Sequence, residues 1–201
     1  MKKLLAFLLA AVMTVSVVAC GSKSNDEQAD APAITDALEI LTTVWGTYEE
    51  AEMFPVGGGD SANLNFEGPA KFDVAAVEEL DVTLGLPADL AGQIDDAASM
   101  MHGMMANNFT AGVYHLTDAS TAEDFTATLK DALLAKQWMC GMPEKVMIIT
   151  VGDYVVSVYG LTDLLDTFTE KLTAEYPSAS VVCEEGLIST TIFLPSTNST
   201  K

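Results

Sequence analysis

The sequence contains no arginine, only two histidines and only three cysteines among its 201 residues, and these scarcities exclude several classes of protein. Its nine lysines are outnumbered by 29 acidic residues, which gives a formal net charge of −20. A chain this acidic has no basic surface for nucleic acid, and anionic lipid headgroups and wall polymers repel it. We therefore expect no nucleic-acid partner. The acidity is typical of a solvated surface, and capture of cations or of a basic partner is the alternative.

The scarcity of histidine also limits catalysis, because a nucleophilic enzyme needs a base beside its nucleophile. His102 and His115 are the two histidines of the chain. His115 falls in a predicted strand, where we expect it to be packed and hydrogen-bonded. The paired carboxylates are adjacent in sequence, so their side chains diverge in a helix or strand. The sequence thus predicts a protein that is not an enzyme and has no cofactor.

The first twenty residues have the layout of an export signal. Two lysines precede an apolar run from Leu4, and the run ends in small residues before Cys20, as in a cleaved secretory signal. Residues 17–20, VVAC, resemble a bacterial lipobox, so we expect removal of residues 1–19 and lipidation of Cys20. More than one acyl chain gives stable anchoring. The predicted location is the outer face of the cytoplasmic membrane, which the protein contacts through this lipid.

The segment that follows the lipidation site, residues 20–33, is small, polar and without periodicity, which is typical of a flexible tether. The remaining chain is long enough for one domain with its own core, which we place at residues 34–194. A polar tail follows at 195–201. Loss of Lys2 and Lys3 with the leader changes the formal charge from −20 to about −22 in the mature chain.

The N-terminal part of this domain, residues 34–107, is predicted to contain two helices separated by a loop. Apolar residues recur at helical spacing over 35–51, and the Gly-rich stretch that follows is typical of a loop. In this loop, Ala62 stands where a calcium site needs an oxygen ligand. The second helix is predicted over 87–106, beginning at Pro87 and carrying Leu90, Ile94 and Met101 on one face.

Four methionines surround His102 in this second predicted helix, in the segment SMMHGMMANN at 99–108. Thioether and imidazole groups are ligands for soft Cu(I). The segment is therefore a candidate metal site, with the ligands Met100, Met104 or Met105 and with His102 or Cys140. A regular helix opposes this site, because it places His102 on the flank opposite Met100. Packing of the methionines into the core is the alternative interpretation.

Residues 110–194 are predicted to form a sheet packed with helices. A β-branched and aromatic segment predicts a strand at 110–118, and residues 120–138 predict a helix with Ser120 and Glu123 in capping-box register. Two apolar strands about Gly152 and Asp153 predict a hairpin. A further helix over 162–176 precedes two last strands, ASVVC and LISTTIFL, which EEG separates.

An internal repeat bears on the topology. The residues from Val113 to Asp118 are echoed from Val158 to Asp163, and FTATL at 125 is echoed by FTEKL at 168. Each copy is a strand that leads into a helix, as in the two halves of a ferredoxin-like sandwich. The predicted fold is therefore α+β, a ferredoxin-like βαββαβ sandwich with an extra C-terminal strand, preceded by two N-terminal helices.

The segments MMANNFTAGVYHLTDA, DFTATLKDALLAKQW and VGDYVVSVYG resemble a family of small, uncharacterised lipoproteins of Gram-positive gut bacteria that carry an α/β domain of unknown function. The resemblance covers about residues 94–165. It implies an anchored extracytoplasmic α/β domain and transfers no catalytic residue. The Gly-rich loop before residue 70 and the strands after 178 depart from the family's pattern, so a function placed there lies outside the analogy.

Cys140 and Cys183 are the thiols that remain once Cys20 is lipidated, and an even pair outside the cytosol is a candidate disulfide. The predicted strand order opposes this bond, because it separates the two strands by about 14 Å, beyond the reach of about 7 Å between bridged Cα atoms. Free thiols would favour a soft-metal role. We expect a non-enzymatic lipoprotein that binds a cell-surface protein, a peptide or a wall component, and copper binding is the alternative.

Overall fold

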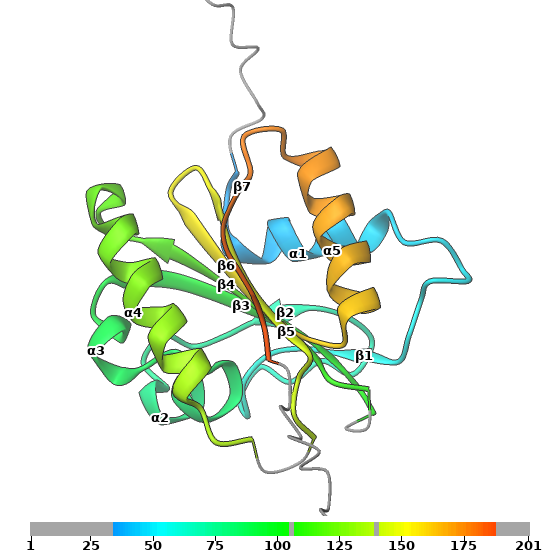
Figure 1. The fold of residues 1–201 in the computed structure, drawn as a ribbon, viewed down its shortest axis with the longest axis horizontal. Helices are drawn as coiled ribbons and strands as arrows, with labels where there is room; N and C mark the ends of the chain where they lie inside the picture. The colour runs from blue at the N-terminus through cyan, green and yellow to red at the C-terminus, as the bar shows by residue number, and fades with distance from the viewer. Residues whose placement is uncertain (1–33, 105–106, 139–140, 188–201) are drawn as a thin grey trace, which may run out of the picture.

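The computed structural model describes residues 34–104, 107–138 and 141–187, and it confirms a mixed α+β fold. An open antiparallel sheet is covered by helices on both faces, which gives three layers (Figure 1). The helices are α1 (Ala37–Gly46), α2 (Val77–Glu79), α3 (Ala88–Ala91), α4 (Ala122–Ala135) and α5 (Thr162–Glu175). The strands are β1 (Val56–Gly57), β2 (Ala70–Lys71), β3 (Ile94–His102), β4 (Phe109–Leu116), β5 (Lys145–Val151), β6 (Tyr154–Gly160) and β7 (Ser180–Gly186).

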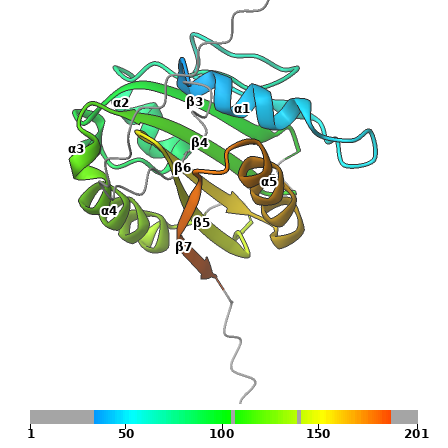
Figure 2. The ribbon, with the colours of Figure 1, turned by 90° about the horizontal axis from the view of Figure 1, so that it is seen from above.

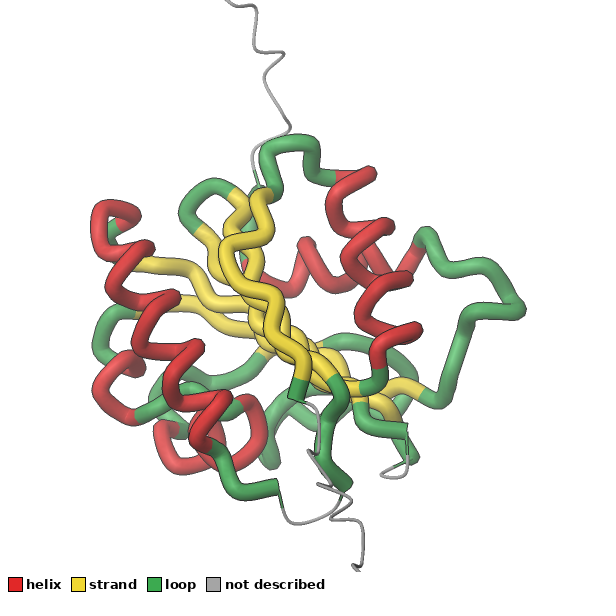
Figure 3. The backbone as a smooth tube through the Cα atoms, in the orientation of Figure 1, coloured by secondary structure: helices red, strands yellow, loops and turns green. Residues whose placement is uncertain are grey.

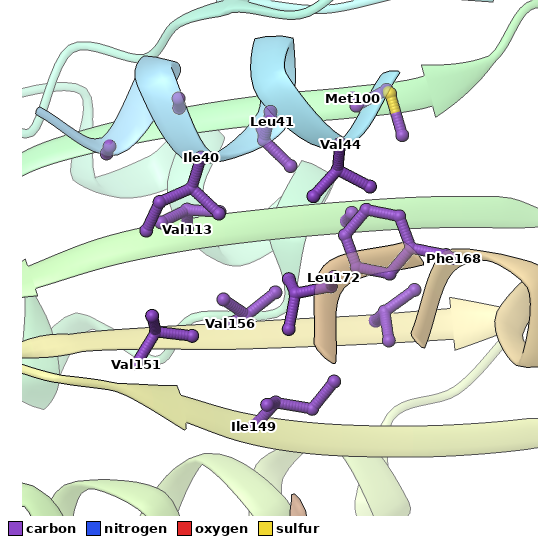
Figure 4. Close-up of a cluster of buried hydrophobic side chains, with 14 of the residues drawn as sticks. Ile40, Leu41, Val44, Met100, Val113, Ile149, Val151, Val156, Phe168 and Leu172 are labelled. Atoms are coloured by element: carbon purple, nitrogen blue, oxygen red, sulfur yellow. The ribbon is translucent and has the colours of Figure 1, made fainter. Parts of the chain in front are cut away.

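The core consists of two apolar clusters, one on each face of the sheet. The first lies beneath α1 and α5 and includes Ile40, Leu41, Met100, Val156 and Phe168 (Figure 4). The second lies beneath α4, on the other face, and includes Tyr114, Phe125, Leu129, Ile148 and Val155. Because both faces are covered, central strands have apolar side chains at consecutive positions instead of an alternating pattern.

The strand order corrects the predicted ferredoxin-like topology. The order is β1-β3-β4-β6-β5-β7, with β2 also paired to β3, so β7 pairs with β5 instead of β4. The crossovers through α4 and α5 therefore step across the sheet in the same direction. Such crossovers are right-handed, and β4 and β6 run antiparallel, which places α4 and α5 on opposite faces. Figure 2 shows this separation, and the repeat thus marks two strand-helix units of a three-layer fold.

The second predicted N-terminal helix, residues 87–106, is wrong. Pro87 precedes a single helical turn, α3, and the chain then forms β3, which pairs with β4. The residues from Ala97 to Met100 are all buried, because α1 packs on one face of β3 and the second cluster covers the other. This burial removes the two-residue alternation that would have indicated a strand.

The other predicted elements are largely confirmed, with two local differences. The helices α1, α4 and α5 and the hairpin of β5 and β6 form as predicted. The predicted capping box of Ser120 and Glu123 is wrong, because α4 begins after Thr121 without a side-chain cap. Ser120 lies in the preceding turn, where its backbone N–H and its hydroxyl donate to Oδ1 of Asp118. The predicted EEG turn is wrong, because β7 continues through Glu184 and Glu185, while most of LISTTIFL, from residue 188, lies outside the described residues.

The Gly-rich loop between β1 and β2 is organised by the buried carboxylate of Asp60. This carboxylate accepts hydrogen bonds from the backbone N–H groups of Ala62 (2.7 Å), Asn63 (3.0 Å) and Asp73 (2.6 Å), and from Nδ2 of Asn63 (2.8 Å). Burial opposes the charge, but these hydrogen bonds outweigh it and lower the pKa of Asp60. The carboxylate therefore joins the loop, through Ala62 and Asn63, to Asp73, which follows β2.

One polar pair crosses the buried sheet beneath α4. The Tyr114 hydroxyl lies 3.2 Å from the Ser157 hydroxyl, and both side chains are buried. The Tyr114 side chain reaches this partner by passing over Gly112, where a Cβ atom would lie 2.4 Å from the Tyr114 hydroxyl oxygen. Burial raises the pKa of Tyr114, which therefore stays protonated. The absence of a side chain at Gly112 makes this contact between β4 and β6 possible.

Candidate functional site

A pocket of about 410 Å³ opens at the end of the sheet where β3 ends and β4 begins. Several connections converge at this end, beside the first turn of α5 (Figure 3). The loop before β1, the strand ends and the start of α5 each contribute to the wall. The lining residues are Glu52, Met53, Phe54, His102, Asn107, Glu144, Leu161, Asp163 and Leu164. The pocket therefore combines apolar, aromatic and acidic groups.

The aromatic wall of the pocket is formed by Phe54 and His102, whose rings are stacked 4.7 Å apart and within 8° of parallel. The backbone N–H of Met104 donates to Nδ1 of His102 over 2.9 Å. Nδ1 is thus an acceptor, so the proton of the neutral imidazole resides on Nε2. Burial lowers the pKa of His102. At neutral pH this histidine therefore adds no positive charge to the pocket.

Three carboxylates surround the aromatic wall. Glu52 forms an ion pair with Lys171 at 2.7 Å, and its pKa is lowered by that hydrogen bond. Glu144 accepts the backbone N–H of Thr162 at the start of α5 over 2.9 Å, and this hydrogen bond lowers its pKa. Asp163 follows in the first turn of the same helix and forms no ion pair with the described residues. The pocket is therefore negatively charged at neutral pH.

A close crossing of backbones at Gly160 fixes the geometry of this end. Gly160 has a φ of 154°, and a Cβ atom there would lie 2.0 Å from the carbonyl oxygen of Asn108. The same carbonyl accepts the N–H of Leu161 over 2.8 Å, while the Gly160 carbonyl accepts the N–H of Glu144 over 2.9 Å. These bonds hold two lining residues in place, Leu161 against the start of β4 and Glu144 against the end of β6.

A second hollow of about 490 Å³ adjoins the first, because Glu144 lines both. It extends across the start of α5 to the end of β7 and is lined by Met142, Pro143, Glu144, Lys145, Thr162, Gly186 and Leu187. Lys145 is neutralised by Asp166 and Glu184, at 2.6 and 2.8 Å. We call the two adjoining hollows, with these lining residues, the end groove.

The residues of the predicted copper site are distributed over different surroundings. Met100 is fully buried in the core beneath α1 (Figure 4), whereas Met104 is 54% exposed and His102 lines the pocket. Met105 and Cys140 lie outside the described residues. Among the described residues, no three histidine, cysteine or carboxylate side chains are grouped to hold a metal ion. Copper binding stays a prediction, and Met100 already fills the core.

The remaining candidate residues lie away from the end groove. Cys183 is half-buried in β7, where burial raises the pKa of its thiol, and its predicted partner Cys140 is not among the described residues. His115 lies toward the opposite end of the sheet, with Nδ1 2.5 Å from Asp95 and its ring packed on Tyr154. The predicted packed and hydrogen-bonded role of His115 is confirmed.

The pocket beside His102 is lined by aromatic, apolar and acidic side chains and one amide. Among the described residues that line the pocket with His102, there is no serine, threonine or cysteine to act as a nucleophile.

None of the helices in the described ranges has the length and apolar character needed to cross a bilayer. No family model matches the chain, and neither the curated proteins nor the solved structures yield a match. Its function must be inferred from its own residues.

Proposed function

We propose that the protein is a lipid-anchored extracytoplasmic binding protein whose ligand presents a positively charged group to the end groove. The observation that carries this proposal is the pocket beside Phe54 and His102, which joins an aromatic wall to the carboxylates of Glu144 and Asp163. The leader that ends at Cys20 supports the anchored location. A peptide, a cell-surface protein or a wall component with an exposed amine has the required chemistry.

The chemistry of the pocket selects charge through two complementary contacts. An ammonium group gains from Asp163, which has no ion-pair partner among the described residues, and from Glu144. The apolar part of the same ligand would pack on Phe54 and Leu164. Charge attraction is stronger in a partly enclosed site than in bulk water. Anionic ligands are repelled by the same carboxylates.

The described chain begins near one end of the sheet, and the end groove lies at the other. The start of α1 is held at the beginning of β3, where the Ala37 N–H donates to Asp96 over 2.7 Å. His102 lies six residues further along β3, a distance of about 20 Å at ~3.3 Å per residue. Figure 1 shows the first described residues near the top of the view and the start of α5 below them. The first described residues thus lie far from the groove.

A matched ligand series tests the proposal. We expect benzylamine to bind the mature chain at least tenfold more tightly than benzyl alcohol or benzoate, which have the same ring without the positive charge. Asp163→Asn should weaken benzylamine binding about threefold, because an exposed ion pair contributes roughly 0.2–1 kcal/mol. Isothermal titration calorimetry at low salt measures both effects.

The control variant is Asp131→Asn, which removes an equal charge from the exposed face of α4, remote from the groove. It should bind benzylamine as the parent does. Equal affinities for the amine, the alcohol and the acid would refute charge selection at this site. An equal loss of affinity in Asp131→Asn and Asp163→Asn would assign the effect to overall charge.

A further inference from the structure

We infer that the chain carries its own occupant for the end groove: residues 188–194, ISTTIFL, dock there and compete with the ligand. The inference rests on the proposed function, because it assigns the same groove a second, internal occupant. It predicts that the protein binds its ligand less tightly than the groove alone would allow. Three observations support it, namely the point where the segment begins, the apolar lining of the groove and the distribution of charge.

The described chain ends inside the groove, directly before the segment. Gly186 and Leu187 line the second hollow, and the Leu187 N–H donates to the Glu144 carbonyl over 2.7 Å. The last described residue, Leu187, therefore lies at the wall that Glu144 shares with the first hollow. Seven residues in extended form span about 23 Å at ~3.3 Å per residue. The segment is thus long enough to cross the groove without leaving its surface.

The apolar surface of the groove suits this segment. Met142 is 50% exposed and lies beside Pro143, while Phe54 and Leu164 line the far hollow. The segment carries four large apolar side chains, Ile188, Ile192, Phe193 and Leu194. Burial of such side chains against apolar surface is favourable. Docking of the segment would therefore bury both its own apolar side chains and the exposed apolar lining of the groove.

The charge distribution favours the same pairing. Residues 188–201 contain no aspartate or glutamate and end in Lys201, although the whole chain has 29 acidic residues. The groove presents Glu52, Glu144 and Asp163. A segment without acidic residues approaches these carboxylates without repulsion. Lys201 adds a positive charge of the kind proposed for the ligand.

The main alternative within the chain is a hairpin in which the segment folds back along β7. Full pairing with Val181 and Val182 needs a two-residue turn at Leu187 and Ile188. Such turns require positive φ angles, which asparagine and glycine adopt and a β-branched residue does not. A longer turn would use residues of the segment that are needed to pair with the two valines. The local sequence thus opposes the hairpin and favours the groove.

Limited chymotrypsin digestion of the full mature chain tests docking directly. Phe66 is 79% exposed and serves as the internal reference. We expect cleavage after Phe193, measured by mass spectrometry, to be at least tenfold slower than cleavage after Phe66. Met142→Ser should accelerate cleavage after Phe193 severalfold, whereas Val82→Ser, at a site 69% exposed and outside the groove lining, should not. Cleavage after Phe193 as fast as after Phe66 in the parent would overturn the inference.

Benzylamine titration separates this inference from the proposed function. Phe193→Ser should raise benzylamine affinity at least threefold, whereas Thr197→Ser should leave it unchanged. Binding that is equal in the parent and in Phe193→Ser supports the proposed function and overturns competition by the segment. Slow cleavage after Phe193, together with no benzylamine binding in either protein, supports docking and overturns the proposed function.

Discussion

Replacement of Gly160 by alanine should lower the free energy of unfolding by about 3–4 kcal/mol and should abolish benzylamine binding in the end groove. The added Cβ would lie 2.0 Å from the Asn108 carbonyl oxygen, and the obstacle is backbone, which no rotamer change can move aside. The φ of 154° adds strain for any residue with a side chain. Relief requires β4 and β6 to separate at the groove, which displaces Leu161 and Glu144.

Urea denaturation of the mature chain measures the first effect, and calorimetric titration measures the second. Gly152→Ala is the matched control, because Gly152 also has a positive φ, 58°, but nothing lies within 4 Å of its Cβ position. That variant should lose only about 1 kcal/mol and keep its affinity. If Gly160→Ala were no less stable than Gly152→Ala, the tight crossing at Asn108 would be disproved.

Replacement of Asp60 by asparagine should cost about 3 kcal/mol of stability at pH 7, because hydrogen bonds to a charged group are worth roughly 1.5–3 kcal/mol each and the site is buried. Three backbone N–H groups and the Asn63 amide all donate to this carboxylate. An asparagine amide places an NH₂ group where an acceptor is required. The loop between β1 and β2 should loosen as a result.

The pH dependence of this loss follows from the lowered pKa of Asp60. The unfolded chain takes up the proton near pH 3.9, whereas the folded carboxylate holds its charge to lower pH. The stabilisation is therefore fully present above about pH 4 and is lost as the pH falls through the folded pKa. Urea denaturation at pH 7 and pH 3 should show a smaller gap between Asp60→Asn and the parent at pH 3. Asp89→Asn, on the exposed side of α3, is the control and should show no gap at either pH.

The secondary structure was predictable where an element is buried on one face only, because its apolar residues then recur at a regular spacing in the sequence. The helices α4 and α5 each turn one apolar stripe to the sheet, so their sequences show the helical period. The strand β3 is buried on both faces at Ala97 to Met100 and has neither period, so residues 87–106 were predicted as a helix. β1 and β2 pair through two residues each, which is too short for any sequence pattern.

The topology could be predicted only in part, for a physical reason. The repeat identifies two strand-helix units, but a local sequence does not specify which neighbour the last strand joins. Pairing of β7 with β5 depends on contacts such as Ile149 beside Val181, which are remote in sequence. The direction of that single step decides whether α4 and α5 share a face.

The sequence pointed to only one residue of the candidate site and gave no indication of the others. His102 was singled out for its rarity and for the methionines around it, and it does line the pocket. Phe54 precedes β1, Glu144 precedes β5 and Asp163 lies in the first turn of α5. They converge only because these elements meet at one end of the sheet. No spacing in the sequence relates them.

The buried hydroxyl pair of Tyr114 and Ser157 has a consequence for how the sheet aligns during folding. Every residue of β6 is buried, so sliding this strand by one position would exchange two equally apolar faces. Hydrophobicity alone does not penalise that misalignment. Sliding would, however, leave two buried hydroxyls without partners, at roughly 1–3 kcal/mol each. These two oxygen atoms therefore favour the correct strand register over shifted registers that bury equally apolar faces.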